Sequence, residues 1–340
     1  MFPIQTIDSY IDQHRLSLEL RPILVGELYL SRKLKCPVYI FKEGTFYPVI
    51  TAGTIPTKDQ ILILSKHQHK EVYVSRADAD EIKKNLEIAL IKITRSLSVG
   101  NPLENGAKDI KLVSLNLSEL YKNPHRDDLL TTQFQSVQNL CKFLIEHKKY
   151  QHQLFQSLVR EQFHFTLVQP MLSSILLLSY LQSIHLFHDR EIESLFLASY
   201  FKDIGFSMIP SGKFDLKTLT TRDQELFANH ADHSFDLLDG RIPLSKSHLT
   251  MIKHHHFMND KMKQYLVKDS DNSQHQEIIF GIESTLVSVF DIVVAMTSDR
   301  PYRKGMSLYQ SMEVVKRMMA DDYPQEFKAL VIFFKQFFKN

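Results

Sequence analysis

The stretch LASYFKDIGFSMIP, residues 197–210, decides the fold expected for the C-terminal half of the chain. It joins an apolar helical segment to Asp203, an Ile-Gly pair and a proline. An aspartate in this place can cap a helix end or act as a buried ligand. Three later stretches also carry metal-ligand residue types: NHADH (229–233), KHHH (253–256) and VFDIVVAMTSDRPYR (289–303). Each alone predicts little, because buried polar groups are usually satisfied within the core, so their order and spacing carry the argument.

The sequence around these motifs is almost entirely helical from Leu129 onward, with apolar residues at three- and four-residue spacing. The stretch from Gln162 to His188 contains no Asp, Glu, Lys or Arg. A membrane span needs about 20 mostly apolar residues, and Gln, Ser and His interrupt this one. We therefore expect a buried core helix and no membrane span.

The N-terminal part differs, with short β-branched and aromatic runs separated by turn signals. These expected strands are VYIFKEG (38–44), TFYPVI (45–50), ILIL (61–64) and EVYVS (71–75). The segment ADADEIKKNLEIALIKI, residues 77–93, predicts an amphipathic helix. Residues 1–97 are thus expected to form a small α+β domain of about four strands with a regulatory or sensory role. Residues 98–128 are rich in Gly, Pro and Asn and predict a linker, followed by a helical domain over 129–340.

The bulk composition fits a soluble protein of two domains, with 340 residues, 44% hydrophobic and 24% charged. A formal charge of +2 creates no strong field for nucleic acid or an anionic membrane. Cys36 and Cys141 are far apart and form neither a zinc knuckle nor a disulfide framework. The start of the sequence has no signal-peptide pattern, so a cytoplasmic location is expected.

Together the four motif stretches resemble the HD-GYP family, bacterial hydrolases of cyclic di-GMP within the HD phosphohydrolase superfamily. The family pattern HDIGKxxIP is matched by KDIGFSMIP, and the helix entered by LTxxE is matched by LTTRDQELFANHADHSFDLL, residues 219–238. MIKHHHFMND (251–260) resembles the HH segment, and DIVVAMTSDRPYRKGMS (291–307) resembles the last motif. The resemblance covers roughly residues 160–320. It implies a mainly α protein, with a C-terminal all-helical HD-domain bundle preceded by the small α+β domain.

The resemblance also implies a set of metal ligands, with Asp203 at the position that bridges two metals in the family. The implied ligands are Asp203, His230, His254, His255 and Asp291. Other family positions have changed: Lys202 replaces the histidine of the HD pair, Gln169 the early histidine, and Phe206 the lysine after HDIG. The DGxGYP loop is absent, and NDKMKQYL follows His256 in its place.

The remaining Asp and three His suit one Fe, Mn, Zn or Ni ion, while the second metal site is expected to be lost. Lys202 would place an ammonium where that second metal lies in the family. We hypothesise that it neutralises Asp203 and Asp291 without a metal. A Lys202 side chain pointing to solvent would refute this hypothesis.

Hydrolysis of a phosphodiester by this family uses two metals to clamp the attacking and leaving oxygens. With one metal, Phe206 in place of the lysine and no GYP loop, we expect impaired catalysis. The resemblance assigns Arg300, Arg303 and Lys304 to phosphate or ligand binding, since Arg suits bidentate phosphate contacts. The structural alternative is a helix end at which Asp299 and Arg300 cap and pair.

Three functions remain open from the sequence. The favoured one is a cyclic di-GMP-related signalling protein that binds a cyclic dinucleotide or other signalling proteins without efficient catalysis. The others are an active metal-dependent phosphodiesterase or phosphohydrolase with a reduced, mononuclear site, and a metal-free structural scaffold. No nucleic-acid partner is expected. The C-terminal segment FKALVIFFKQFFKN predicts a core-docked helix, with a homodimer contact or a membrane-surface helix as alternatives.

Overall fold

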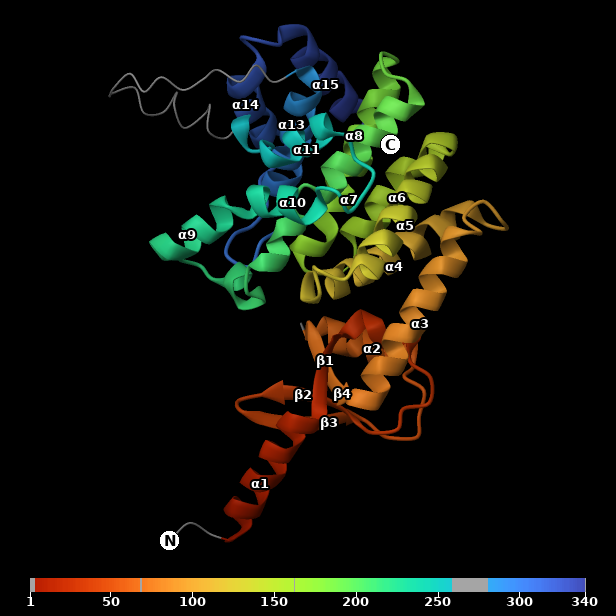
Figure 1. The fold of residues 1–340 in the computed structure, drawn as a ribbon, viewed down its shortest axis with the longest axis vertical. Helices are drawn as coiled ribbons and strands as arrows, with labels where there is room; N and C mark the ends of the chain where they lie inside the picture. Colours follow the sequence, from red (N-terminus) through yellow and green to blue (C-terminus); the bar gives the residue numbers. More distant parts are fainter. Residues whose placement is uncertain (1–3, 68, 162, 259–280, 340) are drawn as a thin grey trace. The chain divides into compact units, whose positions relative to one another are not determined.

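The protein is described by a computed structural model that covers residues 4–67, 69–161, 163–258 and 281–339 (Figure 1). The chain divides into two compact units, Met1–Arg95 (unit 1) and Ser96–Asn340 (unit 2). Unit 1 contains a small antiparallel sheet with helices, and unit 2 is helical. The predicted mainly α class, with a small α+β part followed by a helical bundle, is confirmed.

Unit 1 is built on a four-stranded sheet with the strand order β1-β4-β2-β3. Its elements are α1 (Ile4–Glu19), β1 (Leu20–Leu24), the 3₁₀ helix η1 (Val25–Leu30), β2 (Val38–Lys42), β3 (Thr45–Ile50), α2 (Lys58–Lys66), β4 (Glu71–Ser75) and α3 (Arg76–Thr94). Strands β2 and β3 form a hairpin through Glu43 and Gly44, both with positive φ, which is the backbone that a two-residue hairpin turn requires. The strands expected at 38–44, 45–50 and 71–75 and the helix expected at 77–93 are therefore present.

The strand expected at ILIL (61–64) was wrong, because these residues lie in α2. Thr57 caps this helix and forms a capping box with Gln60, so local capping determines the conformation of the apolar run. The sequence analysis also missed β1, in which Arg21 and Pro22 break the apolar pattern although the strand pairs fully with β4.

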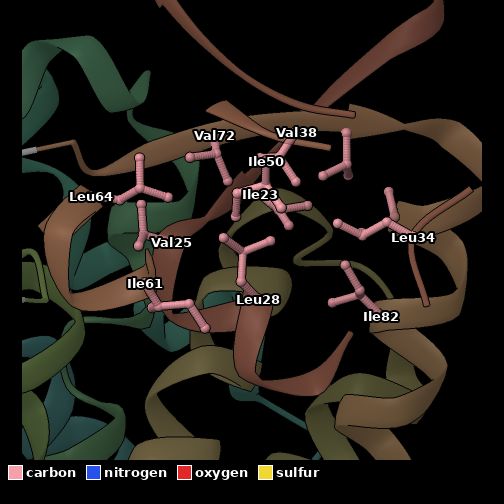
Figure 2. Close-up of a cluster of buried hydrophobic side chains, with 12 residues drawn as sticks. Ile23, Val25, Leu28, Leu34, Val38, Ile50, Ile61, Leu64, Val72 and Ile82 are labelled. Atoms are coloured by element: carbon pink, nitrogen blue, oxygen red, sulfur yellow. The ribbon is translucent and has the colours of Figure 1, made fainter. Parts of the chain in front are cut away.

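The core of unit 1 lies between the sheet and its helices. Figure 2 shows Val38, Ile50 and Val72 of the sheet directed toward Leu28 and Ile82 of the helical segments. All five side chains are buried, and burial of each such side chain contributes roughly 1.5–3 kcal/mol. Unit 1 therefore has a hydrophobic core of its own.

Unit 2 is a bundle in which α7 packs against α8, α13 and α6. Its helices are α4 (Pro102–Lys122), α5 (Asp127–Glu146), η2 (Lys148–Tyr150), α6 (Gln151–Val159), α7 (Phe165–Ile184), α8 (Asp189–Phe201), η3 (Ile204–Met208), η4 (Ser211–Asp215), α9 (Thr221–Ala228), α10 (His230–Leu238), α11 (Lys246–Lys253), α13 (Ile282–Thr297), α14 (Leu308–Met319) and α15 (Pro324–Phe337). In α15, the side chains of Leu330, Phe333, Phe334 and Phe337 are buried, as expected for a core-docked helix.

The linker expected at 98–128 was wrong, because most of it forms α4, which packs on α5, α6 and α7. Asn101 accepts hydrogen bonds from the first turn and Pro102 occupies the first helical position, so these residues start a helix. Gly106 lies close to Phe143 and Leu154, where a Cβ atom would come within 3.0–3.2 Å of both side chains. The glycine that suggested a loop instead allows close helix packing.

Helix α7 is, among the described residues, the one helix long and apolar enough to cross a membrane. However, 83% of its most apolar window is buried inside the protein. Its packing on α8 and α13 places it at the centre of unit 2, as the sequence predicted for a core helix.

Candidate metal centre

A group of metal-ligand side chains converges where four elements of unit 2 meet. Asp203 lies between α8 and η3, His230 begins α10, and His255 and His256 follow the end of α11. Each of the four offers one ligand atom, and these atoms all lie within 4.8 Å of one another. The group of Asp203, His230, His255 and His256 is called the ligand cluster below. Its first three members are buried and His256 is half-buried.

The Asp-Ile-Gly turn and α10 are locked together by Gly205. A Cβ atom at this position would lie 2.0 Å from the carbonyl oxygen of His230, so only glycine fits. The Gly205 N–H donates to Ser234 Oγ at 2.8 Å, and Ser234 Oγ in turn donates to the His230 carbonyl at 2.9 Å. This contact brings Asp203 beside the imidazole of His230.

Two histidines of the ligand cluster are oriented by backbone carbonyls. Nδ1 of His230 lies 2.5 Å from the Phe227 oxygen, and Nδ1 of His255 lies 2.7 Å from the Ile252 oxygen. A neutral imidazole that donates from Nδ1 keeps its lone pair on Nε2. The two Nε2 atoms are directed toward each other, and a hydrogen bond from the second ring nitrogen to a carbonyl is the usual support for a metal-bound histidine.

The Nε2 atoms meet at short range around one carboxylate oxygen. His230 Nε2 lies 3.3 Å from His255 Nε2 and 3.1 Å from His256 Nε2. Oδ1 of Asp203 lies 3.3 Å from His230 Nε2 and 3.2 Å from His255 Nε2. Burial, followed by the neighbouring His255 and His230, lowers the pKa of His256 to about 3, so its imidazole is neutral near pH 7. Electron pairs that face one another in this way are stabilised by a shared cation, and the donor set fits a transition metal.

Lys202 lies next to the ligand cluster and is fully buried. Its Nζ is 2.7 Å from Asp203 Oδ2 and 3.0 Å from Asp291 Oδ1. Burial opposes the charged forms, but the lysine and the carboxylates outweigh it: the pKa of Lys202 is raised, and the pKa values of Asp203 and Asp291 are lowered. Lys202 does not point to solvent, and the expected ion pairs with both carboxylates are present.

Gln169 connects this ion pair to Arg300. Its Nε2 donates to Asp291 Oδ1 at 2.7 Å, and its Oε1 accepts a hydrogen bond from Arg300 Nη2. The guanidinium of Arg300 also stacks 3.9 Å above the centre of the Phe165 ring. Gln169 therefore lies at the site, where the sequence analysis placed the lost histidine.

The other two residues assigned to phosphate binding have partners in their own loop. Arg303 donates to the carbonyl oxygens of Ala295 at 2.7 Å and Met296 at 3.2 Å, at the end of α13. Lys304 is exposed and pairs with Asp299 at 2.9 Å. Their phosphate contact remains a prediction. The end of α13 is bound by Arg303, as a capped helix end would be, but Asp299 pairs with Lys304 and not with Arg300, which contacts Gln169.

His254 and Asp291, both assigned as ligands from the sequence, are not members of the ligand cluster. Asp291 binds Lys202 and Gln169 instead. The sequence analysis missed His256, whose Nε2 reaches that of His230. Helix α11 ends at Lys253 and the three histidines lie in the turn that follows it, so helical geometry could not select among them. The segment NDKMKQYL lies outside the described residues.

Phe206 occupies the side of His230, with ring centroids 4.4 Å apart. It also packs edge-on against Phe214 and Phe227. The position that carries a lysine in the family pattern therefore presents an apolar ring to the centre, and contributes no positive charge.

Comparisons with known proteins bear on the fold. No family model matches the chain, and no curated protein matches it. The chain is similar to the solved structure of Bd1817, an HDG"Y"P protein from Bdellovibrio bacteriovorus, with a TM-score of 0.62 and 13% identity. The match covers 93% of this chain and 100% of that chain. The chain thus has the fold of an HD-GYP protein, as its motifs predicted.

Proposed function

We propose that unit 2 is an HD-GYP-type domain with a one-metal centre, in which Lys202 permanently replaces the second metal. The observation that carries this proposal is the position of the Lys202 ammonium, within 3.0 Å of both Asp203 and Asp291. The ligand cluster beside it keeps one carboxylate and three imidazoles, enough for one Fe, Mn, Zn or Ni ion.

The ligand cluster would hold this ion through Asp203 Oδ1 and the Nε2 atoms of its three histidines. A bound metal ion supplies Lewis-acid charge and lowers the pKa of a coordinated water. The Lys202 ammonium is no Lewis acid and cannot coordinate a water, and its N–H groups already face Asp203, Asp291 and the Ser199 carbonyl. The clamp on attacking and leaving oxygens is therefore incomplete, and hydrolysis is impaired.

The biological role that follows is cyclic di-GMP-related signalling by binding rather than by turnover. Phe206 leaves no lysine for a phosphate, whereas Arg300 retains a guanidinium beside the centre. The domain would then bind a ligand or a protein partner without converting it to a product. A mononuclear phosphodiesterase is the second candidate, favoured by the intact cluster of imidazoles.

Metal analysis of protein purified without a His tag tests the proposal. We expect about one transition-metal ion per chain, lost in the His230→Ala and His255→Ala variants. His233→Ala, one helical turn further along α10, is the matched control and should retain the metal. Two ions per chain would contradict the role of Lys202, and none would favour a metal-free scaffold.

Turnover of cyclic di-GMP by the metal-loaded protein separates binding from catalysis. We expect no hydrolysis above the level of the His255→Ala variant. Hydrolysis by the wild type that disappears in His255→Ala but persists in His233→Ala would establish the mononuclear phosphodiesterase instead.

A further inference from the structure

The charged side chains around the ligand cluster sum to zero net charge without a metal ion. Asp203 and Asp291 are the two carboxylates, and Lys202 lies between them. Arg300, joined to Asp291 through Gln169, supplies the second cation. An imidazole that donates from Nδ1 to a carbonyl and binds a metal through Nε2 carries no charge, so His230 and His255 add none to the metal-bound centre. Two positive and two negative groups therefore cancel.

The two positive charges of a divalent ion bound in this centre would therefore not be compensated by the protein. In a site without Lys202 and Arg300, the two carboxylates would offset both charges of the ion, but here the lysine and the arginine already neutralise the carboxylates. Uncompensated charge in a buried site is strongly unfavourable, and an anionic ligand is the direct remedy. One member of the ligand cluster, His256, and its neighbours Arg300 and Phe206 are half-buried rather than buried, so the centre is partly exposed on this side.

We propose that the occupied centre selects a dianion, namely inorganic phosphate or a phosphate monoester, over a singly charged phosphodiester. This inference rests on the one-metal function proposed above, and it assigns the metal centre a phosphate monoester rather than a phosphodiester of cyclic di-GMP. A monoester carries nearly two negative charges near pH 7 and cancels the charge of the ion. A diester carries one and leaves the buried centre with an excess positive charge.

Charge balance also couples the two binding events. A dianion that binds more tightly when the metal is present must, by linkage, tighten the metal to the same extent. The charge inventory predicts the sign for two opposite variants. Lys202→Gln removes a positive charge, so the metal binds more tightly alone and gains less from a dianion. Asp291→Asn removes a negative charge, so the metal alone binds more weakly, and a dianion increases its affinity by a larger factor.

The test measures binding of Mn²⁺ to the full chain by the loss of the free-ion EPR signal. Mn²⁺ titrations are run without nucleotide, with 5′-GMP and with 3′,5′-cyclic GMP. The two nucleotides share a base and differ by one charge at the phosphate. We expect GMP to tighten Mn²⁺ binding about tenfold or more, and cyclic GMP to do so by a smaller factor. Lys246→Gln, at an exposed lysine paired with Asp239, is the matched control and should behave like the wild type.

The outcomes separate the two proposals. Failure of the wild type to bind Mn²⁺ contradicts the one-metal function and this inference with it. Binding of Mn²⁺ with the same effect of both nucleotides contradicts the dianion preference alone. Should Lys202→Gln not fold, Asp291→Asn still decides, because an unchanged or reduced effect of GMP in that variant overturns the charge argument.

Discussion

Lys202 is the residue whose removal should have the largest effect on stability. Its loss would leave Asp203 and Asp291 buried without their counterion. Removing one partner of a buried ion pair costs about 3–5 kcal/mol. Lys202→Met should therefore lower the free energy of unfolding in urea by that amount. The exposed pair of Lys246 with Asp239 provides the control, because Lys246→Met should cost about 0–1 kcal/mol.

The same ion pair predicts how stability depends on pH. The lowered pKa values of Asp203 and Asp291 mean that their contribution is complete above about pH 4 and lost as pH falls through the lowered values. The raised pKa of Lys202 means that its contribution is present below about pH 10.4 and lost as pH rises further. The free energy of unfolding in urea is measured for the metal-free wild type and for Lys202→Met. The difference between the two should be constant between these pH limits and fall outside them. A difference that persists unchanged at pH 2 would contradict the ion pair.

The choice between neighbouring histidines gives a second test at this scale. His256 belongs to the ligand cluster and His254 does not. His256→Ala should weaken binding of a transition metal about tenfold or more, whereas His254→Ala should leave it nearly unchanged. Isothermal titration with Zn²⁺ measures both. The reverse order would restore the ligand set expected from the sequence.

The members of the ligand cluster that could be predicted from the sequence are those with distinctive neighbouring residues. Asp203 is marked by the Ile-Gly pair after it, and His230 by the stretch of residues 219–238 that resembles the family motif, although the structure divides this stretch into α9 and α10. His256 has no such mark among three consecutive histidines, and only the turn after α11 selects it. The hydrogen bond from Gln169 to Asp291 joins residues 122 positions apart, so it depends on the packing of α7 against α13.

At the scale of elements, the site depends on the contact between η3 and α10. Gly205→Ala would place a Cβ atom 2.0 Å from the His230 carbonyl and 2.7 Å from the Ser234 nitrogen, both rigid backbone atoms. The two elements must separate, which should lower stability by about 3 kcal/mol or more and weaken metal binding. Thermal unfolding and zinc titration measure the two effects.

Gly212→Ala is the control, because a Cβ atom there meets nothing within 4 Å. Its effect should stay within about 0.5 kcal/mol. Metal binding by Gly205→Ala equal to that of Gly212→Ala would show that the contact does not position the ligand cluster.

The elements that could be predicted from the sequence are those whose hydrophobic pattern or flanking turn residues indicate a single conformation. The helix α3 shows three- and four-residue spacing because one face is buried, and the hairpin β2–β3 is bounded by a turn at Glu43-Gly44. Helix α2 was mistaken for a strand because ILIL is equally apolar in both conformations, and the capping by Thr57 decided it. Helix α4 was hidden because its cap and its packing glycine resemble loop residues.

At the scale of the whole molecule, the buried cluster of unit 1 and the ligand cluster are built from different parts of the chain. The buried cluster of unit 1 is formed from residues 23–82, and every member of the ligand cluster belongs to unit 2. Lys202, Asp291 and Gln169, which support the centre, also lie in unit 2. Among the described residues, those that would hold the proposed metal therefore all lie outside residues 1–95.

A fragment of residues 96–340 should fold alone and bind one transition-metal ion as tightly as the full chain. Its circular dichroism should be helical, and its zinc affinity should match that of the full protein within about threefold, a difference near RT. The reason is that the described hydrogen bonds and ion pairs around Asp203 join residues of unit 2. A fragment that folds but binds the metal at least tenfold more weakly would show that unit 1 controls the centre, which would make it a regulatory domain in the direct thermodynamic sense.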